Sequence, residues 1–411
     1  MTEIEKQIRT WDDEDPLAPY RERFVIPKDQ CYLDGNSLGL LPHQVTDRMQ
    51  EVVEQEWGQG AIKSWNDAGW FAAAQRIGDL AAPLLGANPG EVIVGDSMTV
   101  NAFKLLVGFL RQREGDKKIL TQRGNFPTDL YIAESAAKTV GRTTVVRVPD
   151  ENVLEKINDS IDLLYLTHVD YRTARIHDMA AITRRAHEVG AIVIWNLAHS
   201  AGAMKVELGE YGVDAAVGCG YKYLNGGPGA PAFTYLSVRH HTSLEQPLQG
   251  WFGHADPFAF SPDYAPADGI NRLQCGTPPI LSMAALESSL EMWKTVDLDL
   301  LREKSKRLGE LFLELVRERC GRDVFELASP ECSDQRGSHL ALLHPDGFAI
   351  MQALIHHGVV GDYREPNLLR FGFAPLYLSY ADIDHATSIL QQVMSGGEFR
   401  EERFQQRSTV T

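Results

Sequence analysis

The sequence Ala191-Ile-Val-Ile-Trp-Asn-Leu-Ala-His-Ser-Ala-Gly202 decides the fold, because a short apolar run ends abruptly in polar residues. Such a run is typical of a strand that is buried on both faces of a parallel sheet. Asn196 and His199 follow the run directly. Ligands of open α/β sheets bind at the carboxyl ends of the strands, so we expect these two side chains to lie at a functional site.

A second stretch, Asp214-Ala-Ala-Val-Gly-Cys-Gly-Tyr-Lys-Tyr-Leu-Asn-Gly-Gly-Pro-Gly229, carries a lysine in an unusual setting. Lys222 follows small residues and precedes a loop rich in glycine and proline. A lysine in a confined site can lose its proton and become a nucleophile that forms a Schiff base. The alternative is a lysine at a strand end whose stem lies along apolar surface while its ammonium reaches water.

The composition is that of an ordinary soluble globular protein, and the charge argues against a nucleic-acid-binding protein. The 411 residues suit two domains of unequal size, and 44% are hydrophobic, 9% aromatic and 23% charged. The net charge of −16 argues against binding to nucleic acid or to an anionic membrane. An anionic ligand would therefore need a few arginines or a helix N-terminus.

The cysteines and the apolar runs indicate a cytoplasmic location. The five cysteines are scattered and show no CxxC spacing, which favours a reducing compartment without a disulfide framework or a metal site. The first residues lack the apolar core of a signal peptide. No apolar run is long enough to span a bilayer.

Other predicted strands also end in polar residues. Val92-Ile-Val94 leads into a helix near Thr99, where hydroxyl side chains occupy capping positions and a phosphate could bind. A strand near 118–121 leads to Asp129 in the first turn of a helix, which is either a capping residue or a functional carboxylate. A third strand, 162–169, contains Thr167 close to its end.

The connection between the strands near 162–169 and 191–196 predicts a parallel sheet. Asp178 begins a helix with apolar residues at Ile182, Ala186 and Val189, and Gly190 ends it. A strand, a helix and a strand in this order form a βαβ unit, so the sheet is mostly parallel and its strand ends face one crevice.

The two ends of the chain lack the regular alternation of strands and helices that is predicted for its middle part. Asn36 lies in a turn-rich loop that is either a connection or part of a binding site, and Trp65 lies in a polar segment that lines a pocket, forms an interface or simply packs. An amphipathic helix is predicted over 298–320, followed by short strands and helices. We expect a separate α+β domain there, to which the N-terminal arm returns.

A Schiff-base lysine, a helix N-terminus for a phosphate and a polar group for a ring nitrogen together suggest pyridoxal phosphate (PLP). Seven motifs occur in order along the chain: Tyr32-Leu-Asp-Gly-Asn-Ser-Leu-Gly39, Phe126-Pro-Thr-Asp129, Thr167-His-Val-Asp-Tyr-Arg-Thr173, Trp195-Asn-Leu-Ala-His-Ser200, Tyr221-Lys-Tyr-Leu-Asn-Gly-Gly-Pro-Gly229, Gly250-Trp-Phe-Gly-His254 and Gly361-Asp-Tyr-Arg-Glu-Pro366. In these motifs the chain resembles the kynureninases from about residue 10 to its C-terminus.

The resemblance implies a fold-type-I, PLP-dependent homodimer of the class V aminotransferase-like superfamily. The large domain would hold a mostly parallel seven-stranded sheet over 61–285, a smaller α+β domain would follow over 286–411, and the arm and helix of 1–60 would pack with the small domain. The implied reaction is hydrolysis of L-kynurenine, or its 3-hydroxy form, to anthranilate or 3-hydroxyanthranilate and L-alanine, a step of tryptophan catabolism.

The resemblance also assigns roles to individual residues. Lys222 would form the Schiff base and move the α-proton, and Tyr221 would bind phosphate near the bond that breaks. Arg370 would bind the substrate carboxylate through two parallel hydrogen bonds, with Asn36 and Trp65 as weaker candidates for the substrate pocket. The remaining cofactor contacts would come from Met98, Thr99, Phe126, Asp129, Thr167, Asn196 and His199, and from Trp251 and Thr277 acting in the neighbouring subunit's site.

Two positions depart from the family. The family has aspartate where this chain has Asn196, and usually glycine where it has Ala174. A carboxylate about 4 Å from a protonated ring nitrogen contributes roughly 4 kcal/mol at an effective dielectric constant near 20, whereas an amide only hydrogen-bonds. One alternative is therefore a PLP-binding homologue whose turnover is reduced or lost. Another is a cysteine desulfurase, although the sequence around Cys332 does not resemble the motif of that enzyme.

Overall fold

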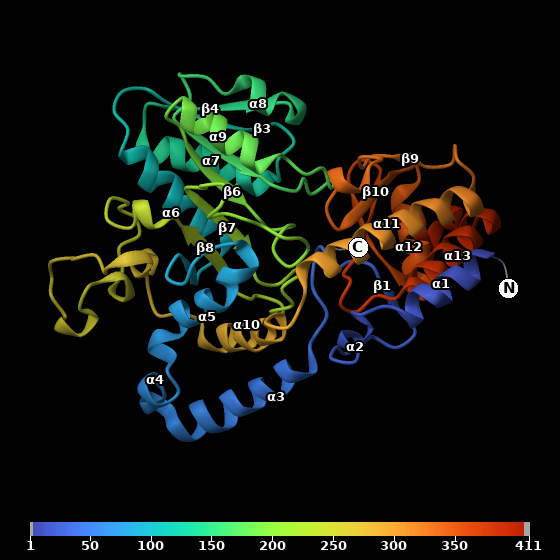
Figure 1. The fold of residues 1–411 in the computed structure, drawn as a ribbon, viewed down its shortest axis with the longest axis horizontal. Helices are drawn as coiled ribbons and strands as arrows, with labels where there is room; N and C mark the ends of the chain where they lie inside the picture. Colours follow the sequence, from blue (N-terminus) through green and yellow to red (C-terminus); the bar gives the residue numbers. More distant parts are fainter. Residues whose placement is uncertain (1–2, 407–411) are drawn as a thin grey trace.

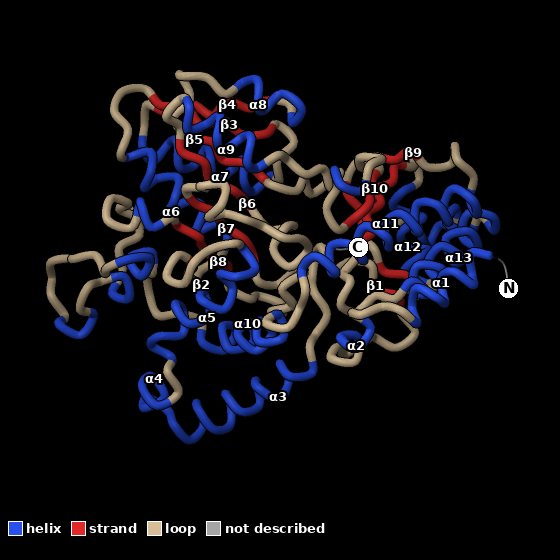
Figure 2. Tube along the Cα trace, viewed as in Figure 1, coloured by secondary structure: helices blue, strands red, loops and turns tan. Residues whose placement is uncertain are grey.

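The computed structural model describes residues 3–406, and its main feature is a seven-stranded sheet in the order β2-β8-β7-β6-β5-β3-β4 (Figures 1 and 2). The strands are β2 (Val92–Val94), β3 (Lys117–Gln122), β4 (Thr143–Val148), β5 (Leu163–Thr167), β6 (Ile192–Asn196), β7 (Ala215–Cys219) and β8 (Ala232–Leu236). Strand β8 pairs antiparallel with β2 and β7, and the other pairs are parallel. The prediction of a mostly parallel seven-stranded sheet is confirmed.

Helices surround this sheet (Figure 2), and its central strands are mostly apolar, whereas the edge strand β4 is largely not buried. Every residue of β5, β7 and β8 is buried, as expected for strands covered on both faces. The helices in this part of the chain are α3 (His43–Glu51), a π-helical continuation over Val52–Gly60, α4 (Ser64–Asp67), α5 (Ala73–Ala81), α6 (Met98–Arg111), α7 (Pro127–Val140), α8 (Val153–Lys156), α9 (Met179–Glu188) and α10 (Ile280–Trp293).

Side-chain caps fix where the predicted helices begin. Ser97 Oγ accepts a hydrogen bond from the Val100 N–H at the start of α6, and the Asp178 carboxylate accepts one from the Ala181 N–H at the start of α9. The predicted helix 298–320 is α11 (Leu298–Cys320), capped by Asp297. Among residues 3–406, no helix is both long and apolar enough to cross a membrane.

A second, smaller region gathers the C-terminal elements with the N-terminal arm. Its four-stranded sheet has the order β12-β13-β10-β9, and β1 pairs in parallel with β11. Helix α1 (Glu3–Asp13) packs beside α13 (Tyr380–Gly396), as Figure 1 shows. The other elements are α2 (Ala18–Arg21), α12 (Gly347–His356), α14 (Glu402–Gln405), β1 (Cys31–Tyr32), β9 (Glu326–Leu327), β10 (His339–Leu343), β11 (Val359–Val360), β12 (Asp362–Arg364) and β13 (Leu368–Gly372). The domain boundaries remain predictions.

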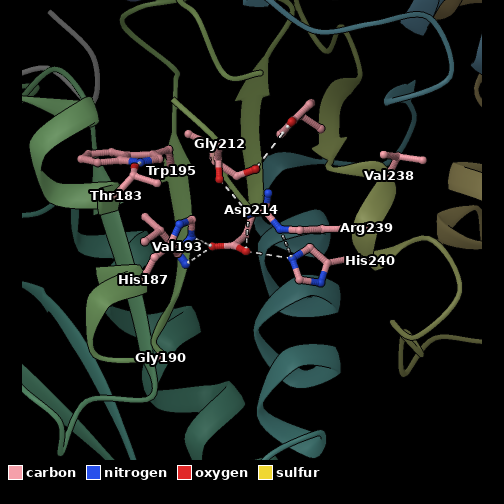
Figure 3. Close-up of polar contacts among 12 residues, drawn as sticks. Thr183, His187, Gly190, Val193, Trp195, Gly212, Asp214, Val238, Arg239 and His240 are labelled. Carbon is pink, nitrogen blue, oxygen red and sulfur yellow. Dashed lines mark hydrogen bonds and ion pairs between the residues drawn. The ribbon is translucent and has the colours of Figure 1, made fainter. Parts of the chain in front are cut away.

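Strand β7, which leads to Lys222, is anchored at its opposite end by Asp214. The buried Asp214 carboxylate accepts hydrogen bonds from His187 Nε2 at 2.8 Å and the Val193 N–H at 2.9 Å, which come from α9 and β6 (Figure 3). Arg239 Nη2 at 2.6 Å and His240 Nε2 at 2.8 Å approach its other oxygen. One carboxylate therefore ties β6, β7, α9 and the turn after β8 together.

Candidate active site

A cavity of about 180 Å³ lies where the carboxyl ends of the central strands meet the arm and the smaller sheet. Its lining residues come from all three parts of the chain: Asn36, Ser37, Met98, Phe126, Thr167, Tyr171, Asn196, Ala198, His199, Tyr221, Lys222, Arg364 and Arg370. Nine of these residues are among the predicted site residues. The cavity therefore lies at the edge of the sheet where the strand ends predict a site.

Lys222 borders this cavity yet lies deep in the protein. It occupies the bend after β7, three residues beyond Cys219, rather than the strand end that the sequence predicted. Its Nζ lies 2.8 Å from His199 Nε2. Burial lowers the pKa of Lys222, and burial together with the Lys222 charge holds the pKa of His199 well below its usual range. Both shifts disfavour the charged forms, and a lysine with a lowered pKa is suited to act as a nucleophile.

The N-terminus of α6 supplies an anion-binding position. Met98, the first residue of the helix, lines the cavity, and Thr99 is the next residue although it does not line the cavity itself. The first N–H groups of a helix have no partner within the helix, and the helix dipole favours negative charge there. A phosphate group in the cavity would meet these N–H groups.

Asn196 lines the cavity with Asp129 directly behind it. Asn196 Nδ2 donates to Asp129 Oδ2 at 2.7 Å, and Asn196 Oδ1 accepts from the Ala198 N–H at 2.8 Å. Tyr165 Oη donates to the other Asp129 oxygen at 2.7 Å. Burial raises the pKa of Asp129, while these hydrogen bonds from Tyr165 and Asn196 oppose the rise. Because Asp129 only accepts and Ala198 N only donates, the two partners fix the orientation of the Asn196 amide.

The edge of the cavity near Phe126 is held by the ends of β3 and β5. The side chain of Gln122 accepts from the Thr167 N–H at 2.8 Å and donates to the Thr167 carbonyl at 3.1 Å. Asn125 Oδ1 accepts from Thr167 Oγ1 at 2.5 Å and from the Phe126 N–H at 2.8 Å. Phe126 packs edge-on against Tyr171 with ring centroids 5.1 Å apart. An aromatic ring and a hydroxyl group are thereby fixed on one wall.

The N-terminal loop closes over the Lys222 turn. The Gly39 N–H donates to the Tyr221 carbonyl at 2.9 Å, and a side chain at Gly39 would collide with the Lys222 carbonyl. Asn36 is fully buried against Gly372, where a side chain would likewise collide with the Asn36 amide. Glycine is therefore needed at both positions, because the Lys222 carbonyl and the Asn36 amide approach them closely.

Three predicted residues lie away from the cavity. Trp65 and Trp251 both pack against Phe252, with ring centroids 5.6 Å and 4.5 Å from it. Trp251 is 40% exposed, and Thr277 is also exposed. The chain alone does not bring these three side chains to Lys222, and their roles remain predictions.

Sequence reasoning gave no site role to four lining residues: Tyr171, Ala198, Arg364 and Ser37, the last of which it noted only as available for binding. All four stand inside the motifs that carried the resemblance, so a signal was present. Local patterns could not separate them from their neighbours, because which side chain faces the cavity depends on how the loops fold.

Comparisons with known proteins show which family the chain resembles. Residues 301–390 match the family model described as the kynureninase C-terminal domain. The chain is 46% identical to the kynureninase of Burkholderia pseudomallei (strain 1106a) over 406 residues, covering 97% of this chain and 98% of that protein. It is also similar to the kynureninase of Pseudomonas fluorescens, at 45% identity with the same coverage of 97% and 98%.

A solved structure shows the same fold at low sequence identity. The apo cysteine desulfurase from Thermococcus onnurineus NA1 matches with a TM-score of 0.77 at 19% identity, covering 92% of this chain and 98% of that chain. Identity this low shows the fold alone, whereas the curated relatives match almost end to end. On that evidence, the chain belongs to the kynureninase family.

Proposed function

We propose that this protein is a PLP-dependent kynureninase that hydrolyses the bond between Cβ and Cγ of L-kynurenine, giving anthranilate and L-alanine. The observation that carries the proposal is the cavity, in which Lys222, the α6 N-terminus, Asn196 and Arg370 meet. The match to curated kynureninases over 97% of the chain supports the same activity.

The residues around the cavity fit PLP. Lys222 would bond to the cofactor aldehyde, the N–H groups at Met98 and Thr99 would hold the phosphate, and Phe126 would stack on the ring. Asn196, with Asp129 behind it, would face the ring nitrogen, and Thr167 and His199 would meet the polar edge. When bound, PLP supplies an electron sink for bonds at the substrate α-carbon.

The protein side of the reaction follows from the same positions. Lys222 Nζ, neutral when its bond to the cofactor has been exchanged, removes the substrate α-proton, and the neighbouring His199 Nε2 accepts a hydrogen bond from it. Arg370 contributes positive charge for the substrate carboxylate. Tyr221, which lines the cavity beside Lys222, lies near the bond that breaks. Water attacks the substrate γ-carbonyl, and its oxygen leaves in the anthranilate carboxylate.

We infer that the active form is a homodimer with shared sites. A loop that extends from the large sheet, at the left of Figure 1, exposes three aromatic side chains: Trp251 at 40%, Phe258 at 60% and Phe260 at 78%. Exposed aromatic clusters of this kind are typical of protein interfaces. A second copy seated there would let Trp251 and Thr277 reach the phosphate position of its partner. The five free cysteines support a reducing, cytoplasmic location.

Two alternatives make different predictions. Reduced or lost turnover would follow if the Asn196 amide stabilises the protonated ring nitrogen too weakly. Cysteine desulfurase activity would need a thiol at the cavity, but no cysteine is among the residues that line it, and Cys332 is exposed elsewhere.

One assay separates the three functions. Purified protein with PLP is incubated with L-kynurenine, 3-hydroxykynurenine and L-cysteine. Kynureninase activity releases anthranilate or its hydroxylated counterpart, whereas a desulfurase releases sulfide only. A protein that binds PLP but forms none of these products would instead be the inactive homologue.

A further inference from the structure

Most N–H groups of Arg370 already have acceptors within the protein, so it has no free pair of donors for a substrate carboxylate. Its Nε donates to Asp362 Oδ1 at 2.7 Å, and its Nη2 donates to Asp362 Oδ2 and to Ser37 Oγ. Its Nη1 donates to the Tyr171 carbonyl at 2.5 Å. A guanidinium group has five N–H donors, so Arg370 keeps about one of them for a ligand. Recognition of a carboxylate through two parallel hydrogen bonds therefore needs another donor.

Arg364 has the donors that Arg370 lacks. It lines the same cavity, and its Nη2 donates to Asp362 Oδ2 at 2.7 Å. Among residues 3–406 its one other hydrogen bond is a long one of 3.5 Å from Nη1 to the Tyr363 carbonyl, and its buried Nε has no hydrogen-bond partner there. Its side chain is 38% exposed, and the second N–H of Nη2 and one N–H of Nη1 have no acceptor among residues 3–406.

The charged side chains at this end of the cavity together favour the binding of one carboxylate group. Burial disfavours the ionised form of Asp362, but hydrogen bonds and charge from Arg370 outweigh it and lower the pKa of Asp362. Asp362 therefore offsets one of the two arginine charges. Asp34 lies close by, and burial together with the Asp362 charge raises its pKa, which disfavours its ionised form. The cluster keeps net positive charge for an anionic group.

We propose that Arg364 is a further substrate-binding residue, which binds the α-carboxylate of the amino-acid substrate together with the free donor of Arg370. Asp362 is the positioning residue that holds both guanidinium groups. This inference rests on the proposed function only in requiring an amino-acid substrate, and it leaves the identity of the substrate side chain open.

The test compares two ligands that differ by the carboxylate. The holoenzyme is titrated with L-alanine and with ethylamine, and binding is followed by the change in absorbance of the bound cofactor. Loss of charge-assisted hydrogen bonds in Arg364→Gln is expected to raise the Kd for L-alanine roughly 10- to 100-fold while leaving the Kd for ethylamine unchanged. Arg364→Lys keeps the positive charge but lacks the planar pair of donors. Its Kd for L-alanine is therefore expected to lie between those of wild type and Arg364→Gln.

A matched control removes an equal charge at a distance. Arg142 is 70% exposed and pairs with Asp116, so Arg142→Gln should leave both Kd values unchanged. An equal change for L-alanine and ethylamine in Arg364→Gln, or no change for L-alanine, would overturn the proposal. If Arg364→Gln does not bind the cofactor, the test uses the Kd values of Arg364→Lys and wild type for L-alanine and ethylamine instead. L-alanine binding does not require cleavage of kynurenine, so failure of the proposed function would show separately.

Discussion

Asn196 Nδ2 donates a 2.7 Å hydrogen bond to Asp129 Oδ2, so the Asp129 carboxyl group stands behind an amide that lines the cavity. Restoring the family residue with Asn196→Asp is expected to raise kcat, because a carboxylate stabilises a protonated ring nitrogen by direct attraction. Steady-state rates of the two holoenzymes measure this effect. Equal rates would contradict it.

The same substitution should destabilise the apoprotein. Asn196→Asp places a second carboxylate beside Asp129, where burial already raises the pKa. Two buried carboxylates at this separation share a proton, which weakens folding at neutral pH relative to the native amide. Urea unfolding of both apoproteins should show the variant less stable. A variant of equal stability would show that the Asp129 site is more polar than its burial implies.

Ala174→Gly is expected to stabilise the protein. Ala174 is fully buried with a φ of +62°, in the left-handed region that favours glycine. An L-residue costs about 1 kcal/mol or somewhat more there, so the variant should gain roughly that amount in thermal unfolding. Ala181→Gly, in helix α9, is the control and should lose roughly 1 kcal/mol instead. A loss in both variants would refute the strain at position 174.

Asp214→Asn should remove an anchor of β7 in a pH-dependent way. Burial disfavours the charged form, but hydrogen bonds from His187, His240 and Arg239 outweigh it and hold the pKa of Asp214 below its ordinary value. A depressed carboxyl pKa stabilises the fold above the unfolded value of about 3.9, and this contribution is lost as pH falls through the folded value.

We therefore expect Asp214→Asn to lower the free energy of unfolding by about 3–5 kcal/mol at neutral pH. The difference from wild type should narrow progressively below about pH 4, where wild-type Asp214 also takes up a proton. Asp116→Asn, at an 83% exposed carboxylate, is the control and should change little. A difference that stays constant with pH would assign the effect to packing rather than to charge.

The shared-site dimer is testable by complementation. Lys222→Ala would remove the proposed nucleophile, and Trp251→Ala would remove the side chain that the proposed dimer offers to the partner subunit. In a mixed dimer, one of the two sites keeps both residues, so a refolded equal mixture should recover about a quarter of wild-type activity. A mixture no more active than its separate components, or a monomer in sedimentation, would contradict the dimer.

The sequence predicted most of the sheet because buried parallel strands are continuous apolar runs. Leu163–Thr167 and Ile192–Asn196 lie within two residues of their expected bounds, and the caps at Asp178 and Asp297 set their helices. The same logic located Asn196 and Thr167 at the cavity. Arg370 was predicted from the resemblance to the kynureninases rather than from periodicity, because its strand, β13, lies in the four-stranded sheet.

The arrangement within the site could not be predicted from sequence. The Asp362 bridge between Arg364 and Arg370 depends on the register of β12 against β13, which pairs Asp362 with Arg370. The position of Trp251 depends on a loop without regular periodicity. In both cases long-range packing decides the contacts, and local patterns do not report it.

The central claim is hydrolysis of the Cβ–Cγ bond of kynurenine, and isotope labelling tests it most directly. The holoenzyme is incubated with L-kynurenine in water enriched in heavy oxygen, and the products are weighed by mass spectrometry. We predict equal amounts of L-alanine and anthranilate, with one heavy oxygen atom in the anthranilate carboxylate and no products from Lys222→Ala. Absence of anthranilate, or anthranilate without the label, would contradict the assignment.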